Sequence, residues 1–213
     1  MTVLQVRMSI FGSSHGNHGL PEELEKLRAQ FPWCLPFDGN SFDSEGGRKI
    51  RDIEVEQIRQ HFLFSIGPSI FIIILGTNNI RRGGNALEIV ALFRKILENA
   101  VCFLNIQIVI VSLIPSAVPE VNKRFLDASN LLKNLVKEMD TQTNKRKYEN
   151  ATFFNLTPTL SPSNKVAPVY FKSVKVDPTT QRQKNVHLSP LGANRLAYTI
   201  FDHCTRFIIN KFK

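Results

Sequence analysis

Four short segments of the chain contain the residue types that acyl transfer requires. Residues 11–15 (FGSSH) place a serine near glycine, residues 45–47 (EGG) contain two glycines, residues 75–79 (LGTNN) contain two asparagines, and residues 186–190 (VHLSP) contain a histidine. Acyl transfer needs a nucleophile, a base that accepts its proton, and N–H donors that stabilise the oxyanion formed from the attacked carbonyl. In chain order, these segments supply a candidate for each role.

Each role can be assigned to a named residue. Ser14 is the candidate nucleophile and His187 the candidate base. The oxyanion would be held by the backbone N–H of Ser14, the backbone N–H of Gly46 or Gly47, and the side-chain amide of Asn78. Every assignment has a structural alternative: the serine and the histidine as helix caps, the asparagine as an Asx turn, and the glycines as a turn with positive φ.

Hydrophobic periodicity predicts the strands and helices that position these segments. Strands are expected over residues 3–11, 33–37, 69–75 and 106–113 and from 152. Helices are expected from 21, from about 50 to near 67, and over 85–100, 121–140 and 191–209. The run SIFIIIL at 69–75 has no polar alternation, which is typical of a parallel strand buried on both faces. The alternation predicts one α/β domain over residues 1–213, a five-stranded parallel sheet between two helical layers, with ligands at the carboxyl ends of the strands.

Two finer expectations concern helix faces and a long loop. The apolar spacing that marks one helix is set by Ile50, Ile53, Ile58 and Phe62, and the next helix is expected to bury one side through Leu87, Val90, Ala91, Arg94, Ile96 and Leu97. Residues 156–184 contain four prolines and no glycine, and only residues 169–176 resemble a strand. We expect a long basic loop here, and loops of this length in a compact domain are usually functional or disordered.

The net charge of +9 lies entirely in the final third of the chain. Residues 1–144 contain 15 basic and 15 acidic residues, whereas residues 145–213 contain 12 basic and 3 acidic residues, a difference of +9. This asymmetry predicts an acidic partner, either RNA or another nucleic acid, or anionic lipid. The alternative is that the basic residues only keep loops solvated. The candidate anion-binding residues are Lys145, Arg146, Lys147, Lys165, Lys172, Lys175, Arg182, Lys184, Arg195 and Arg206.

From residue 6 to about residue 197, the chain resembles the SGNH hydrolases, also called GDSL-type esterases and lipases. The resemblance rests on Gly76, Thr77 and Asn78 after a buried strand, together with the sequence HLSPLG at 187–192. It implies a flavodoxin-like fold and hydrolysis of esters on carbohydrates, lipids or small acyl groups. It also implies the roles given above to Ser14 and His187.

Three positions depart from the pattern of this family. Ser13 and Asn79 stand where the family usually has aspartate, and Lys184 stands where the triad acid is expected, three residues before His187. A lysine has N–H donors and no acceptor, so it cannot orient the imidazole, and its charge opposes the imidazolium that forms during attack. Asp177 is our first candidate for a replacement acid; a backbone carbonyl or Asn185 are the alternatives.

Two functions from different classes follow. The first is a serine esterase with a non-standard or weakened triad, acting on a small ester or an acylated molecule. The second is an inactive SGNH-like domain that binds RNA through its basic final third. The chain also resembles the SGNH-like RNA-binding domain of the Oskar family and the esterase domains of some retrotransposons, which would join the two functions.

Other features narrow the cellular setting. The first residues lack a cationic start followed by a long apolar run, and the longest apolar run, residues 70–75, is too short to span a bilayer. Three cysteines suggest buried free thiols in a reducing compartment, so we expect a cytoplasmic or nuclear protein. The pair His15 and His18 makes a poor metal site, and we expect neither a metal nor a cofactor. Arg81 and Arg82, near the candidate pocket, are expected to bind an anionic group or to form a solvated loop tip.

Overall fold

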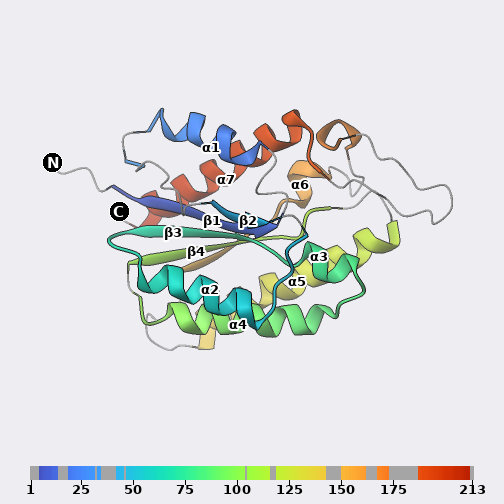
Figure 1. Ribbon diagram of the computed structural model, residues 1–213, viewed down its shortest axis with the longest axis horizontal. Helices are drawn as coiled ribbons and strands as arrows, with labels where there is room; N and C mark the ends of the chain where they lie inside the picture. The colour runs from blue at the N-terminus through green and yellow to red at the C-terminus, as the bar shows by residue number, and fades with distance from the viewer. Residues whose placement is uncertain are drawn as a thin grey trace.

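The computed structural model describes residues 5–13, 19–31, 33–34, 42–45, 47–103, 105–115, 119–142, 150–161, 167–172 and 187–211. These residues form a parallel β-sheet with helices on both faces, as Figure 1 shows edge-on. The sheet has five strands in the order β2-β1-β3-β4-β5. The α/β class and the three-layer arrangement predicted from the sequence are therefore present.

Each strand of the sheet pairs in parallel with its neighbours. The strands are β1 (Arg7–Ser13), β2 (Phe42–Glu45), β3 (Ser69–Ile74), β4 (Ile106–Val111) and β5 (Ala151–Phe154). All six residues of β3 are buried, as the apolar run in its sequence predicts. Alternate side chains of β3 enter different cores: Ile72 packs with α1 and α7, and Ile73 with α2 and α4.

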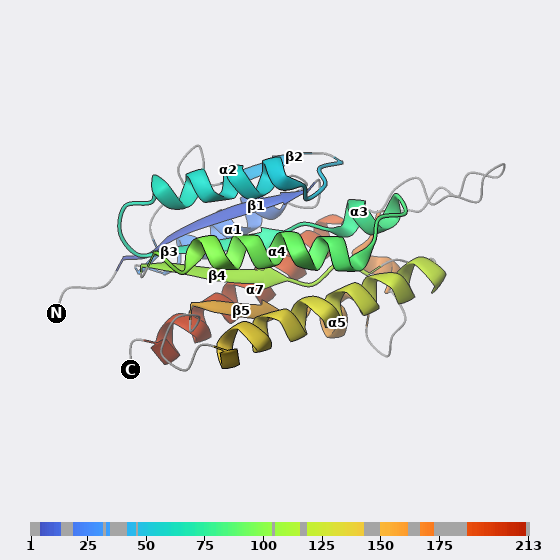
Figure 2. The same ribbon diagram turned by 90° about the horizontal axis from the view of Figure 1, so that it is seen from below.

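The helices form one layer on each face of the sheet (Figures 1 and 2). One layer consists of α1 (Leu20–Arg28), α6 (Thr157–Leu160) and α7 (Pro190–Lys211); the other consists of α2 (Asp52–Leu63), α4 (Ala86–Ala100) and α5 (Pro119–Gln142). Two short helical segments, α3 (Thr77–Arg81) and η3 (Pro168–Tyr170), lie in the connections. Asn85 caps α4 by accepting the N–H of Leu87 at 2.9 Å, as N-cap asparagines do.

The strand that pairs with β1 at the edge of the sheet is β2, which lies after the strand that we predicted over residues 33–37. Of residues 33–37, only Trp33 and Cys34 are described, and Cys34 makes an isolated bridge with Val6. Trp33 packs instead against Phe201 of α7, with ring centroids 5.5 Å apart. The edge strand β2 lies between the strand expected over 33–37 and the helix expected from about residue 50. We did not predict it from the sequence, because its sequence (FDSE) is polar and contains no apolar run.

Some burial predictions were also wrong. Ile53 and Leu87 are 57% and 63% exposed, and Ala91 is exposed too. Ile96 and Leu97 are buried as predicted, and Ile89 and Phe93 share the buried face of α4 with them. The long loop begins with α6, and Val169 lies in η3 rather than in a strand. Cys34 and Cys204 are buried as expected, but Cys102 is exposed. No helix of the described residues is long and apolar enough to cross a membrane.

Candidate functional site

The candidate nucleophile and the candidate oxyanion donors follow the carboxyl ends of β1, β2 and β3 in the sequence. Ser13 ends β1 and pairs in register with Glu45, which ends β2. The nucleophile candidate Ser14 and the donor candidate Gly46 follow these two paired residues directly in the chain, and both lie outside the described residues. The described part of the site therefore consists of Gly47, Asn78 and His187.

A tight turn after β3 positions Asn78. Gly76 has φ of 101°, a conformation that favours glycine, and a Cβ added there would lie 2.9 Å from the side chain of Leu113. Thr77 then accepts the N–H of Ile114 through its hydroxyl at 3.4 Å. The glycine thus starts α3 directly at the end of β3, and the threonine ties this turn to the segment that leaves β4.

Both asparagines of α3 bind the loop that follows β2. The amide of Asn78 donates to the carbonyl of Arg48 at 2.9 Å. Asn79 makes two hydrogen bonds to Ile50: its Oδ1 accepts the backbone N–H, and its Nδ2 donates to the carbonyl, both at 2.9 Å. The amide of Asn78 has a second N–H, for which no described residue supplies an acceptor. It can therefore serve an oxyanion while the first N–H fixes the side chain.

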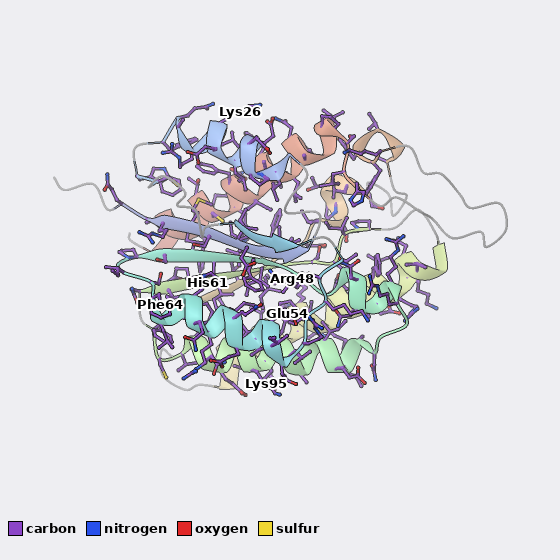
Figure 3. The ribbon with its side chains drawn as sticks, in the orientation of Figure 1. Lys26, Arg48, Glu54, His61, Phe64 and Lys95 are labelled. Atoms are coloured by element: carbon purple, nitrogen blue, oxygen red, sulfur yellow. The ribbon has the colours of Figure 1, made fainter. Side chains whose placement is uncertain are left out.

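Arg48, a residue of the same loop, fixes the loop through its buried side chain. The side chain of Arg48 is 8% exposed and donates to the carboxylate of Asp43 at 2.6 Å. Its guanidinium lies 4.6 Å from the ring centre of Phe11, and the second carboxylate oxygen of Asp43 is 3.3 Å from Nε2 of His61. Figure 3 shows Arg48 and His61 between the sheet and α2. The pairing with Asp43 offsets the cost of burying the arginine's charge.

His187 lies on a short antiparallel pairing that precedes α7. The backbone N–H of Lys172 donates to the carbonyl of His187 at 2.8 Å, and Phe171 bridges Leu188. The Nδ1 atom of His187 is shielded from solvent. Ser189 caps α7 by accepting the N–H of Gly192 at 3.1 Å, so the backbone on both sides of the histidine is held by hydrogen bonds.

The start of α1 packs against the start of α7, the helix that follows His187. A Cβ added at Gly19 would lie 3.5 Å from that of Ala193 in the first turn of α7. Asn194 donates to Glu23 of α1 at 2.6 Å. The segment that contains Ser14 runs from Ser13, at the end of β1, to Gly19, so its far end lies against the helix that His187 precedes.

Most other candidates lie outside the described residues. These are Asp177, Lys145, Arg146, Lys147, Lys165, Lys175, Arg182 and Lys184, together with the pair His15 and His18. Among the three described basic candidates, Lys172 and Arg195 are exposed, and Arg206 pairs with Asp202 at 3.0 Å. No cluster of possible metal ligands occurs among the described residues.

Sequence reasoning missed the residues that support the site. Asn79 was noted only as a departure from a family pattern, and Asp43, Arg48 and His61 were not candidates. Nothing in their residue types or spacing distinguishes them from surface polar residues. Their roles arise from contacts with partners far away in the chain. Ile50 and Asn79, for example, are hydrogen-bonded although they are separated by 29 positions in the sequence.

Comparison with solved structures identifies the fold. A member of the lipolytic G-D-S-L protein family from Veillonella parvula matches with a TM-score of 0.67 at 16% sequence identity, over 94% of this chain and 99% of that one. A family 3 carbohydrate esterase from Talaromyces cellulolyticus gives 0.63 at 16% identity, over 97% and 99%. AlinE4, an esterase of the SGNH-hydrolase family, gives 0.55 at 17% identity, over 97% of each chain.

This protein therefore has the α/β fold of the SGNH, or GDSL-type, esterases and lipases. No family model and no curated protein matches the sequence. At these identities the likeness concerns the fold, so the activity has to be argued from the residues of the site.

Proposed function

We propose that the protein is a serine ester hydrolase with a non-standard triad. In this proposal the Oγ of Ser14 attacks the carbonyl carbon of the ester, and its proton moves to a ring nitrogen of His187. The N–H groups of Ser14, of Gly46 or Gly47, and of Asn78 hold the oxyanion. The ester C–O bond then breaks, and the leaving alcohol takes the proton from the histidine.

Water completes the proposed reaction. It attacks the acyl-serine while its proton moves to His187, and the acid leaves as the serine oxygen recovers that proton. No metal or redox partner enters either half of the reaction. The products are one acid and one alcohol for each ester and water consumed.

One observation carries this proposal: the amide of Asn78 is fixed to the loop of Gly47, at the carboxyl edge of the sheet. One amide N–H is held by the carbonyl of Arg48, which leaves the second in a set orientation. A preorganised donor stabilises an oxyanion because it does not have to reorient during the reaction. The fold shared with esterases supports the same assignment.

The acid of the triad is the non-standard part. We assign Asp177 to orient His187, because Lys184 in the expected position offers no acceptor. The shielding of Nδ1 from solvent supports a protein group at that ring position. If the assignment is right, Asp177→Asn lowers ester turnover; an unchanged rate removes Asp177 from the mechanism.

Labelling with a fluorophosphonate probe tests the nucleophile. We expect the full chain to react with the probe, Ser14→Ala to lose the reaction, and both proteins to melt at similar temperatures. Ser65→Ala is the matched control, because Ser65 lies in the connection between α2 and β3, at the opposite edge of the sheet, and should label normally. Equal labelling of Ser14→Ala and the original chain would refute the assignment.

The charge distribution favours one alternative, an inactive domain that binds RNA. The net charge of +9 in residues 145–213 motivates it. Its test is the binding of a labelled RNA oligonucleotide at several salt concentrations, since phosphate contacts weaken steeply as salt rises. Salt-sensitive RNA binding together with no probe labelling would favour this function over hydrolysis.

A further inference from the structure

The two loops at the oxyanion side of the site carry an excess of positive charge. Residues 46–51 and 76–87 contain five basic residues and no acidic residue. Two of the five are neutralised: Arg48 by Asp43 at 2.6 Å, and Arg51 by Glu54 at 2.7 Å. The other three are Lys49, Arg81 and Arg82, and Arg82 is the one whose guanidinium borders Gly47.

Arg82 lies directly against the oxyanion loop. A Cβ added at Gly47 would be 3.3 Å from Nη2 of Arg82, so the guanidinium approaches the backbone where glycine has no side chain. Arg82 is exposed, and no carboxylate of the described residues forms an ion pair with it. A planar group with several N–H donors therefore borders the candidate site, and no carboxylate of the described residues pairs with it.

Neighbouring arginines add to this charge. Burial lowers the pKa of Arg81, and the positive charge of Arg82 lowers it further, because the two guanidinium groups lie close together. Arg124 of α5 donates to the carbonyl of Gly84 at 3.3 Å, which places a third guanidinium beside the same turn. An anion bound here would offset the repulsion between these groups.

We propose that Arg82, supported by Arg81, binds an anionic group of the substrate, so that the enzyme prefers esters that carry a carboxylate or a phosphate. This inference rests on the proposed hydrolase function and specifies its substrate class. The anion lies beside Gly47, on the side of the site where Asn78 holds the oxyanion. Arginine suits this role because its fork of donors matches the oxygens of both anions.

Paired substrates test the preference. We expect the kcat/KM for 4-nitrophenyl hydrogen succinate or glutarate to exceed that for 4-nitrophenyl acetate or butyrate. Arg82→Gln should lower kcat/KM for the anionic esters about tenfold more than for the neutral ones, as expected for one charge-assisted hydrogen bond. Arg82→Lys should retain part of the preference. Arg59→Gln, an exposed arginine paired with Glu56 on α2, should leave both rates unchanged.

The kinetics of Arg82→Gln decide whether Arg82 binds the anionic group of the substrate. An equal loss for anionic and neutral esters in Arg82→Gln would overturn it. If the original chain hydrolyses neither type, the proposed function fails, and the anion site is tested by titrating succinate and inorganic phosphate by NMR. Binding that Arg82→Gln weakens and Arg59→Gln does not would uphold the anion site without the enzyme. Equal binding in both variants, or none in the original chain, would reject it.

Discussion

At the scale of single residues, the two adjacent asparagines of α3 perform different tasks on one loop. Asn78 binds Arg48 with one N–H, and its second N–H can serve the oxyanion. Asn79 both accepts from and donates to the backbone of Ile50. A carboxylate has only acceptors, so it could not make both bonds. This explains why an amide at position 79 suits this chain.

Removing this double hydrogen bond should destabilise the protein. Asn79→Ala leaves the N–H and carbonyl of Ile50 without their partners, and Asn79→Asp sets a carboxylate against that carbonyl. We expect each change to lower the free energy of unfolding by about 1–3 kcal/mol, measured by urea denaturation. Asn194→Ala, an exposed amide bonded to Glu23, should cost about 0.5 kcal/mol or less. If the Asn79 variants and Asn194→Ala lowered the free energy of unfolding equally, the double hydrogen bond of Asn79 would not be the cause of the loss.

At the scale of elements, the start of α7 is fixed by a close backbone contact. A Cβ added at Gly192 would overlap the carbonyl oxygen of Tyr170 and lie 2.9 Å from its carbonyl carbon. The same carbonyl accepts the N–H of Ser189 at 2.9 Å. The glycine therefore lets α7 approach η3, and this contact keeps His187 paired with Lys172.

Gly192→Ala should be destabilising despite the higher helix propensity of alanine. A helical glycine in open space gains about 1 kcal/mol on this change, whereas here the added methyl group must push η3 away. We expect a lower melting temperature and a lower rate of ester hydrolysis, because the displaced segment pairs with His187. The control is Thr199→Ala on the exposed face of α7. If Gly192→Ala raised the melting temperature, the close contact between Gly192 and the carbonyl of Tyr170 would not limit stability.

At the scale of the whole molecule, α7 joins the last strand to the rest of the core through His203. Its Nε2 lies 3.3 Å from the hydroxyl of Thr152, and its ring lies 4.8 Å from that of Phe154, both on β5. Burial lowers the pKa of His203, opposed by nearby Asp202 and assisted by Arg206. The folded state thus favours the neutral imidazole between the sheet and the helix.

The stability of the fold should therefore decrease in mild acid. Below pH about 6.5, His203 takes up a proton more readily in the unfolded chain than in the folded one, so stability falls as the pH drops toward the folded pKa. Urea unfolding at pH 7.5 and pH 5.5 measures this loss. His203→Gln should show a smaller loss between the two pH values than the original chain. An identical loss in the variant would exclude this residue as the cause.

Much of the architecture follows from the sequence because it depends on local patterns. The apolar run of β3, the Asn85 cap and the alternation of strands and helices are confirmed in the structure. The residue types near the strand ends also predicted that the site lies in the loops at the carboxyl ends of the strands. The roles of all the site residues remain predictions, and Ser14, Asp177 and Gly46 also lie outside the described part of the chain.

Tertiary structure decided the features whose partners lie far apart in the chain. It placed the edge strand in a polar segment, turned Ile53 and Leu87 outward, and buried the side chain of Arg48 in the loop after β2. No local pattern predicts these outcomes, because a polar side chain has the same sequence signal whether it faces water or a distant partner. Residue order thus determined which chemistry the chain can offer, and folding determined which groups meet.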